Sequence, residues 1–204
     1  MEFILPVFIQ NFRQINMAEE SLDRQRRVLL SLAGMAALIE PDISDASVVP
    51  QPAATGKPGD FDFLNGEWGI KHRRLKNDQW DMFDGTASVF GLLSGIASVE
   101  ELRIPSRNFS GMGLRLLDTK RNLWADYWLN GQDGKLNPPT WGSFVAGAGT
   151  WDSHDTNGDT PTITRGVWDQ ISVNACRWRQ AASGDGGTSW KANWIKHWTR
   201  KVAR

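Results

Sequence analysis

The chain has 204 residues, with 23 basic and 23 acidic side chains and therefore no formal net charge. This length suits one domain with an extension and provides enough residues for a real core. The neutral balance excludes an overall field that would recruit nucleic acid or an anionic membrane. Cys176 is the only cysteine, which excludes an intrachain disulfide.

Residues 1–57 differ from the rest of the chain and read as an N-terminal extension. Residues 28–39, VLLSLAGMAALI, are apolar on every side except Ser31 and follow an arginine-rich string. This pattern is typical of a signal peptide, and the run is too short for a stable membrane span. The string RQRRVLLS approximates a twin-arginine signal, which predicts a periplasmic protein.

Other interpretations of this extension stay open. Acidic residues follow the apolar run, and the run begins late unless translation starts at Met17 rather than Met1. The alternative is a helix packed against the domain of a cytoplasmic protein. If a signal is cleaved, the shortened chain is expected to begin near Ser47. Residues 47–59 are rich in Pro, Gly and Ala and are predicted to be a linker.

Residues 58–204 are predicted to form one all-β domain. Apolar and polar residues alternate with a period of two, and glycine-rich turns recur. Eleven Trp, nine Phe and 20 Gly beside a single Tyr suit aromatic strands joined by glycine turns. Short connections imply an antiparallel meander of about 8–10 strands, and closing it into a barrel removes the exposed edges. The predicted strands are residues 66–75, 80–90, 97–103, 109–117, 122–129, 141–145, 148–154, 161–168, 174–182 and 189–200.

The last predicted hairpin is rich in tryptophan. Its arms flank SGDGGTS, which resembles an Asp-box turn, where Asp185 accepts amide hydrogens and Trp190 packs beneath. If Trp178 faces Trp194, the indoles and the charged residues separate onto opposite faces. The indole face is expected to point inward, because burying the arginines of the other face would cost more. It consists of Cys176, Trp178, Gln180, Trp190, Ala192, Trp194, Lys196 and Trp198.

Gly66-Glu67-Trp68 opens the first predicted strand, and Arg200 ends the last one. This arrangement resembles the calycin or lipocalin superfamily, in which the Trp closes the barrel base and the Arg packs across it. The strings DFDFLNGEW, HRRLK, FDGT, GLRLLD, YWLNGQDGKL and DGGTSW are together similar to a bacterial lipocalin-like family of unknown function. The resemblance covers about residues 60–200. It implies a calycin-like β-barrel and supplies no activity or catalytic residues.

His72 and Arg74 are the first candidate site residues. They share the inward parity of Trp68, and a buried His and Arg are costly unless they meet a polar partner or ligand. His72 is therefore a candidate for ligand recognition or acid–base chemistry, with Arg74 holding a carboxylate or phenolate. The alternative is a position near the mouth, solvated or paired with Asp84 or Asp126.

Other reactive residues have less support from the pattern. Arg115 lies between two leucines and is predicted to face the outer surface. Lys196 and Gln180 fit either a ligand site or ordinary snorkelling and internal hydrogen bonding. Cys176 is predicted to be a small core residue. The histidines lie too far apart for a metal site, and no phosphate-loop, dinucleotide or nucleophile-elbow pattern occurs, so neither metal nor cofactor is expected.

These features predict a barrel that binds a small apolar or aromatic molecule in a Trp-rich cavity. The alternatives are a cofactor-free lyase, isomerase or cyclase that uses His72 in the same cavity, and a structural protein with a filled barrel. Neither a nucleic-acid partner nor a membrane anchor is expected, and a homodimer is compatible with the sequence. The pattern does not identify the ligand. The predicted ligand-binding residues are His72, Arg74, Trp178, Gln180, Trp190 and Trp194.

Overall fold

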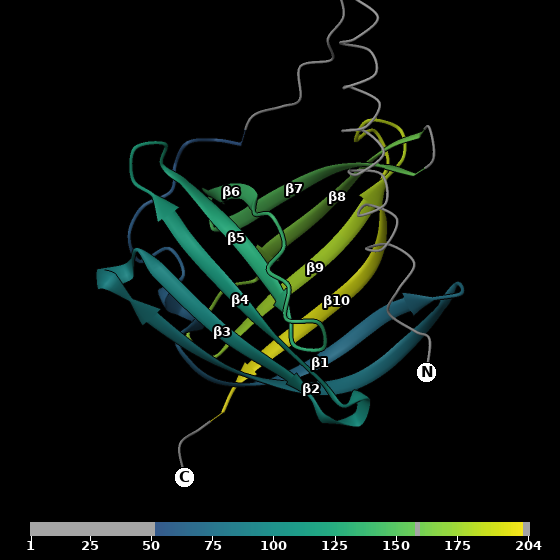
Figure 1. Ribbon diagram of the computed structural model, residues 1–204, viewed down its shortest axis with the longest axis horizontal. Coiled ribbons are helices and arrows are strands. Elements are labelled where there is room, and N and C mark those ends of the chain that lie inside the picture. Colours follow the sequence, from purple (N-terminus) through teal and green to yellow (C-terminus); the bar gives the residue numbers. More distant parts are fainter. Residues whose placement is uncertain (1–51, 158–159, 202–204) are drawn as a thin grey trace, which may run out of the picture. The chain divides into compact units, whose positions relative to one another are not determined.

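The computed structural model describes residues 52–157 and 160–201, which form a closed antiparallel barrel (Figure 1). Each strand pairs with its neighbours in the chain, and the last strand pairs with the first. The strands are β1 Gly66–Lys76, β2 Gln79–Leu92, β3 Ala97–Ile104, β4 Phe109–Asp118, β5 Leu123–Asn130, β6 Thr140–Val145, β7 Ala148–Asn157, β8 Thr160–Asp169, β9 Ala175–Ser183 and β10 Lys191–Arg200. Three short 3-10 turns are η1 Asp62–Leu64, η2 Leu93–Gly95 and η3 Pro105–Arg107.

The predicted all-β fold, an antiparallel barrel of about 8–10 strands, is confirmed. Each predicted strand has a counterpart among the ten strands of the described residues, and the last begins at Lys191 instead of residue 189. Residues 1–51, with the apolar run and the signal-like string, lie outside the described residues. The domain boundary at residue 57 therefore stays a prediction. Among the described residues, no helix has the length and apolar character that a membrane crossing requires.

One end of the barrel, here called the closed end, is built around Trp68. This indole is fully buried, and its Nε1 donates a hydrogen bond of 2.6 Å to the carbonyl oxygen of Leu64 in η1. The Arg200 guanidinium lies 4.3 Å from the centre of the Trp68 ring and donates to the carbonyl oxygen of Phe63 at 2.8 Å. The expected contact between Trp68 and Arg200 is therefore present, and η1 completes the closure.

Aromatic rings fill the closed end. The Phe61 ring, brought in by the turn before β1, lies 4.9 Å from the Trp124 ring and 5.0 Å from the Phe144 ring. The rings of Trp168 and Trp198 are 5.3 Å apart in the same cluster. Edge-to-face contacts of this kind fill space with little loss of packing density. These packed rings, which we call the plug, fill the closed end of the barrel.

The residues just before this plug also contact the barrel. The backbone N–H of Gly56 donates to the carbonyl oxygen of Asn122 at 2.8 Å, and Thr55 Oγ1 donates to the carbonyl oxygen of Phe144 at 2.8 Å. Part of the predicted linker is thus hydrogen-bonded to the strands. These contacts matter for choosing where a truncated domain should begin.

The turn between β9 and β10 has the expected Asp-centred geometry. Asp185 accepts hydrogen bonds from the backbone N–H of Ser189 at 2.9 Å and from its hydroxyl at 2.6 Å. Trp190 Nε1 donates to the carbonyl oxygen of Gly187 at 3.0 Å. These bonds lower the pKa of Asp185 to about 2. The turn is a structural element that fixes the start of β10.

The predicted interior position of Trp190 is wrong. The β9–β10 register shifts between Ala192 and Trp194, so residues before the shift no longer keep the parity of those after it. The Trp190 ring instead stacks with Arg165 at 4.2 Å, and Arg165 pairs with Asp152 on the outer surface. Trp178 also pairs with Lys196 rather than with Trp194, an offset of two residues that keeps both side chains inside.

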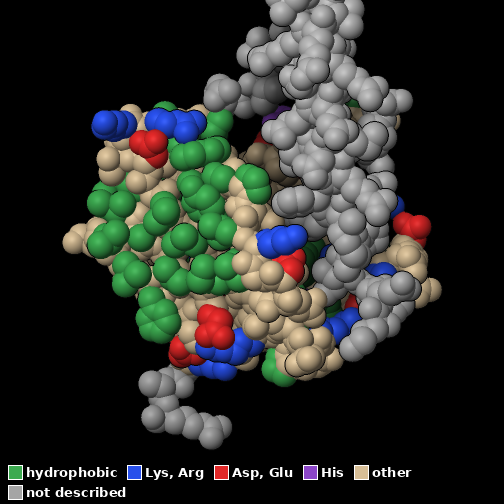
Figure 2. All heavy atoms as spheres, viewed as in Figure 1, with side chains coloured by type: hydrophobic (Ala, Val, Ile, Leu, Met, Phe, Trp, Pro, Cys, Tyr) green, Lys and Arg blue, Asp and Glu red, His purple; other side chains and the backbone are tan. Residues whose placement is uncertain are grey.

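An apolar face covers the outside of β2 to β5, where Figure 2 shows hydrophobic side chains gathered together. Cross-strand pairs place these side chains in rows, because Phe90 pairs with Val99, Val99 with Leu114, and Leu114 with Tyr127. Phe90 is 60% exposed. Faces of this kind are typical of contacts with other proteins. The homodimer that the sequence allows stays a prediction, and we expect its two copies to meet at this apolar face.

Candidate functional site

The opposite end of the barrel, here called the mouth, differs from the closed end in its inward-facing tryptophans. Trp128, Trp178 and Trp194 point inward by strand register, yet each is only partly buried. At the closed end the Trp68 and Trp198 side chains are at most 1% exposed. An inward-facing side chain can remain exposed only if space lies in front of it. These rings are therefore less covered than those of the closed end, and we call the mouth side of the plug the open half of the barrel.

Lys196 occupies the centre of this open half. It lies on β10, opposite His72 of β1 and Trp178 of β9, and is 8% exposed. Its Nζ lies 4.3 Å from the Trp178 ring centre, 4.6 Å from that of Trp194 and 5.9 Å from that of Trp128. These three rings and the amine form what we call the indole cage. Burial lowers the pKa of Lys196 to about 8.

A buried cluster of charges lies on the opposite strands. Arg115 on β4 is hydrogen-bonded to Glu100 on β3, and its Nε lies 3.6 Å from a carboxylate oxygen of Asp126 on β5. Burial opposes the charge of Arg115, but Glu100 and Asp126 more than offset this effect and raise its pKa. Burial also raises the pKa of Asp126. The arginine therefore stays charged and holds both carboxylates.

The predicted outer position of Arg115 is wrong. The side chain is 4% exposed, and the leucines on either side of it, Leu114 and Leu116, point outward into the apolar face. Polarity normally separates the inner and outer residues of a strand, but here the outer residues are apolar and an inner residue is charged. The inward position of Arg115 could have been deduced from that of Trp68, but only if the pairing between neighbouring strands were known.

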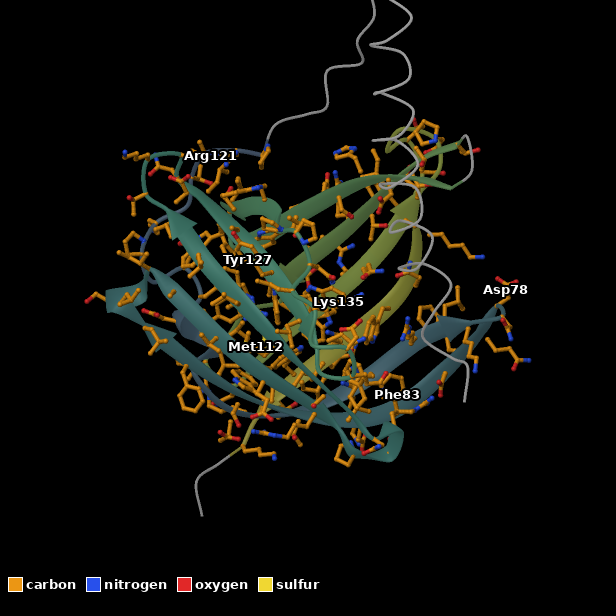
Figure 3. All side chains as sticks on the ribbon, in the orientation of Figure 1. Asp78, Phe83, Met112, Arg121, Tyr127 and Lys135 are labelled. Atoms are coloured by element: carbon orange, nitrogen blue, oxygen red, sulfur yellow. The ribbon has the colours of Figure 1, made fainter. Side chains whose placement is uncertain are left out.

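His72 forms part of the wall of the open half. It is 1% exposed, its ring stacks on Phe83 at 4.7 Å, and its Nδ1 accepts a hydrogen bond of 3.3 Å from Trp194 Nε1. Figure 3 labels Phe83 on β2, away from the β1–β2 turn that carries Asp78, and the Arg107 guanidinium of η3 lies 4.6 Å from the Phe83 ring centre. Burial, with the charge of Lys196, lowers the pKa of His72 to about 3. The imidazole is therefore neutral near pH 7 and holds the Trp194 indole in place.

Two glycines make room for these rings. A Cβ atom on Gly85 would lie 2.6 Å from His72 Nε2, and a Cβ atom on Gly111 would lie 2.3 Å from the Trp128 ring. Both distances are far below a van der Waals contact, so a side chain at either position would displace the ring. The inner glycines of β2 and β4 thus permit an aromatic lining that is larger than the strands would otherwise allow.

Arg74 lies at the rim of the same wall. Its side chain is exposed, and its guanidinium stacks on the Trp194 ring at 4.6 Å. Asp84 and Asp126, the two carboxylates considered as its partners, instead pair with Lys71 and Arg115. Burial of the stem and the nearby charge of Arg107 lower the pKa of Arg74. The guanidinium is therefore held flat over an indole at the entrance.

The structure brings five of the predicted site residues to the mouth half: His72, Arg74, Trp178, Gln180 and Trp194. Gln180 lies beside Trp194 on the inner face, and the rings of Trp178 and Trp194 meet edge to face at 5.8 Å. Sequence reasoning missed Phe83, Glu100 and Trp128 altogether. It left the role of Lys196 undecided.

A separate groove of about 580 Å³ lies at the closed end. It contains none of the predicted site residues, and its walls come from the approach to η1, the β6–β7 turn and Ile171. The mouth half, where charged and aromatic side chains converge, fits a ligand site better than this groove does.

The chain matches no family model and no curated protein. It is similar to the solved structure of EF1p2_mFAP2b bound to DFHBI, with 12% identity over 70% of this chain and 98% of that one, at a TM-score of 0.37. It is also similar to a protein of unknown function from the DUF3598 family of Nostoc punctiforme PCC 73102. There the identity is 13% over 74% of this chain and 52% of that one, about half its length, at a TM-score of 0.39. The fold described above therefore rests on the closed antiparallel barrel itself.

Proposed function

We propose that the open half of the barrel binds a small, flat, apolar or aromatic molecule. The observation that carries this proposal is the indole cage, in which three inward-facing indoles remain partly exposed around one buried amine. Ring faces that are open to a lumen offer a large apolar contact area at a small cost in conformational entropy. A few polar groups around such a lining are the usual composition of a specific small-molecule site.

Arg74 is the best candidate to bind an acidic group of the ligand. It lies at the entrance, and its guanidinium is already oriented by Trp194. Deeper in the barrel, the carboxyl groups of Glu100 and Asp126 already occupy Arg115. A ligand with a carboxylate or phenolate is therefore expected to insert its apolar part and keep its charged end at the rim.

The alternative, an enzyme that uses His72 as acid or base, is less well supported. A catalytic acid or base works best when its pKa is near the working pH. With a pKa lowered to about 3, His72 holds no extra proton near neutral pH, and its Nδ1 lone pair is engaged by Trp194. These observations favour a positioning role for His72 and a binding role for the barrel.

Titration with 1-naphthoate, followed by tryptophan fluorescence, tests the proposal. We expect saturable quenching, and Arg74→Ala should weaken binding by about 1–3 kcal/mol because a charge-assisted hydrogen bond is lost. Arg73→Ala is the matched control, since Arg73 stacks on Trp80 at 4.9 Å on the outer face. If quenching does not saturate, or if both variants weaken binding equally, the proposed site is wrong.

A further inference from the structure

Lys196 has a chemical environment that simple aromatic binding does not require. The buried Glu100 and the partly buried Asp126 both lie within ion-pair distance of Arg115. Within the described residues, no carboxylate lies in ion-pair distance of Lys196 Nζ, whose recorded contacts are the faces of the indole cage. A primary amine is thus held in an apolar enclosure that faces the open lumen.

Burial of this amine favours its neutral form. Burial has the largest effect on the pKa of Lys196 and lowers it to about 8. The negative charges of Glu100 and Asp126 raise this pKa, and the positive charges of Arg115 and Arg74 lower it further. His72, directly opposite on β1, is neutral and adds no charge. A desolvated lysine beside other cations is the usual setting of a nucleophilic amine, because the free base persists near neutral pH.

We propose that Lys196 captures conjugated or aromatic aldehydes as a covalent imine within the indole cage. This inference rests on the proposed function, because the aldehyde must occupy the same open half of the barrel. The amine nitrogen adds to the carbonyl carbon, giving a carbinolamine, and the hydroxyl group then leaves as water while the C=N bond forms. One aldehyde and one amine yield one imine and one water, with no oxidant or reductant.

An aldehyde fits this depth of the barrel better than an acid does. A carboxylate placed at Lys196 would add a third negative charge near Glu100 and Asp126, which Arg115 already balances in part. A carbonyl group is neutral on arrival. Once formed, the imine can carry a proton, and the same carboxylates and the indole faces then stabilise its positive charge. A flat conjugated chain would lie against the Trp178 and Trp194 rings.

Reductive trapping of the full chain tests this inference. The protein is incubated with trans-cinnamaldehyde and cyanoborohydride at pH 7.5, and the modified peptides are identified by mass spectrometry. At pH 7.5, a pKa of about 8 instead of 10.5 gives a free-amine fraction roughly 200-fold larger than that of an ordinary lysine. Since a less basic amine is also a weaker nucleophile, we expect Lys196 to be labelled at least about tenfold faster than Lys71 or Lys191, which are exposed and ion-paired.

Two comparisons complete the test. Lys196→Met should abolish this fast labelling while the circular dichroism spectrum stays that of the parent, and Lys71→Met should leave the labelling unchanged. Cinnamyl alcohol, which cannot form an imine, reports on occupancy of the open half by fluorescence quenching. Saturable quenching by the alcohol without an adduct on Lys196 would overturn the imine and leave the proposed function intact. Absence of both would overturn both, and labelling spread evenly over the lysines would also overturn the imine.

Discussion

The two ends of the barrel interior use tryptophan in opposite ways. At the closed end, the side chains of Trp68, Trp168 and Trp198 are at most 2% exposed and pack against one another or against η1. At the mouth, Trp178 of β9 and Trp194 of β10, the strand that also carries Trp198, surround a lysine and remain partly exposed. One residue type thus supplies stability at one end and a binding surface at the other. The difference lies in the neighbours, since the closed-end rings pack against other rings and η1, whereas the mouth rings surround the Lys196 amine.

The largest effect should come from removing a tryptophan of the closed end. Trp68→Ala deletes a fully buried indole and its hydrogen bond to Leu64, and should lower the free energy of unfolding by about 3–5 kcal/mol. Trp178→Ala at the mouth should cost much less, because its ring is already partly exposed. Urea denaturation followed by circular dichroism measures both. Equal losses for the two variants would contradict the division of the interior.

The buried ion pair gives the next largest effect. Arg115→Met leaves Glu100 buried without its partner and should cost about 3 kcal/mol, at the lower end for such changes because the carboxyl can take up a proton. Arg165→Met is the matched control, since it breaks a half-exposed pair with Asp152 and should cost under about 1 kcal/mol. Adding Glu100→Gln to Arg115→Met should recover part of the loss. No recovery would mean that Arg115 contributes through packing alone.

Much of the fold could be predicted from the sequence, because alternation and turn residues are local signals. The strand series follows from such signals, whereas the contact of Trp68 with Arg200 was implied by the resemblance to the calycin superfamily. The site depends on register, which local signals specify poorly. Trp190 was misplaced because a bulge of one residue reverses parity within β10. Arg115 was misplaced because the outer face of its strand is apolar, which removes the contrast on which parity depends.

The indole cage was only partly predictable for a related reason. Its members come from β5, β9 and β10, and Trp128 of β5 joins the other two only when the barrel closes. The alternation of apolar and polar residues places Lys196 inside, but it cannot show that the nearby carboxylates form ion pairs with Arg115. Local sequence therefore predicts which residues face inward, and the closed topology decides which of them meet.

The protonation of Lys196 gives a pH-dependent effect of intermediate size. The folded pKa is lowered to about 8 from 10.5, so the unfolded chain binds a proton in this range that the folded protein has lost. The free energy of unfolding contributed by this group therefore rises with pH between these values, by roughly 2–3 kcal/mol. Lys196→Met should lack this rise, whereas Lys191→Met, on the exposed surface, should keep it. Stability curves at pH 7 to 10.5 that coincide for Lys196→Met and the parent would contradict the lowered pKa.

The smallest predicted effect concerns the link between His72 and the cage. Trp194→Phe keeps an aromatic ring but removes the N–H that donates to His72 Nδ1, and it should cost about 0.5–1.5 kcal/mol at pH 7.

That hydrogen bond favours the neutral imidazole, so its loss should raise the pKa of His72 from about 3 toward its ordinary value, while burial still holds it low. Because the unfolded histidine binds a proton below about pH 6.5 and the folded one does not, the parent loses stability as the pH falls from 6.5 toward 3. The variant should lose less over the same range, and NMR titration of His72 should show the raised pKa directly. An unchanged pKa for His72 would mean that burial alone sets it, and the mouth wall would then owe its order to packing rather than to this hydrogen bond.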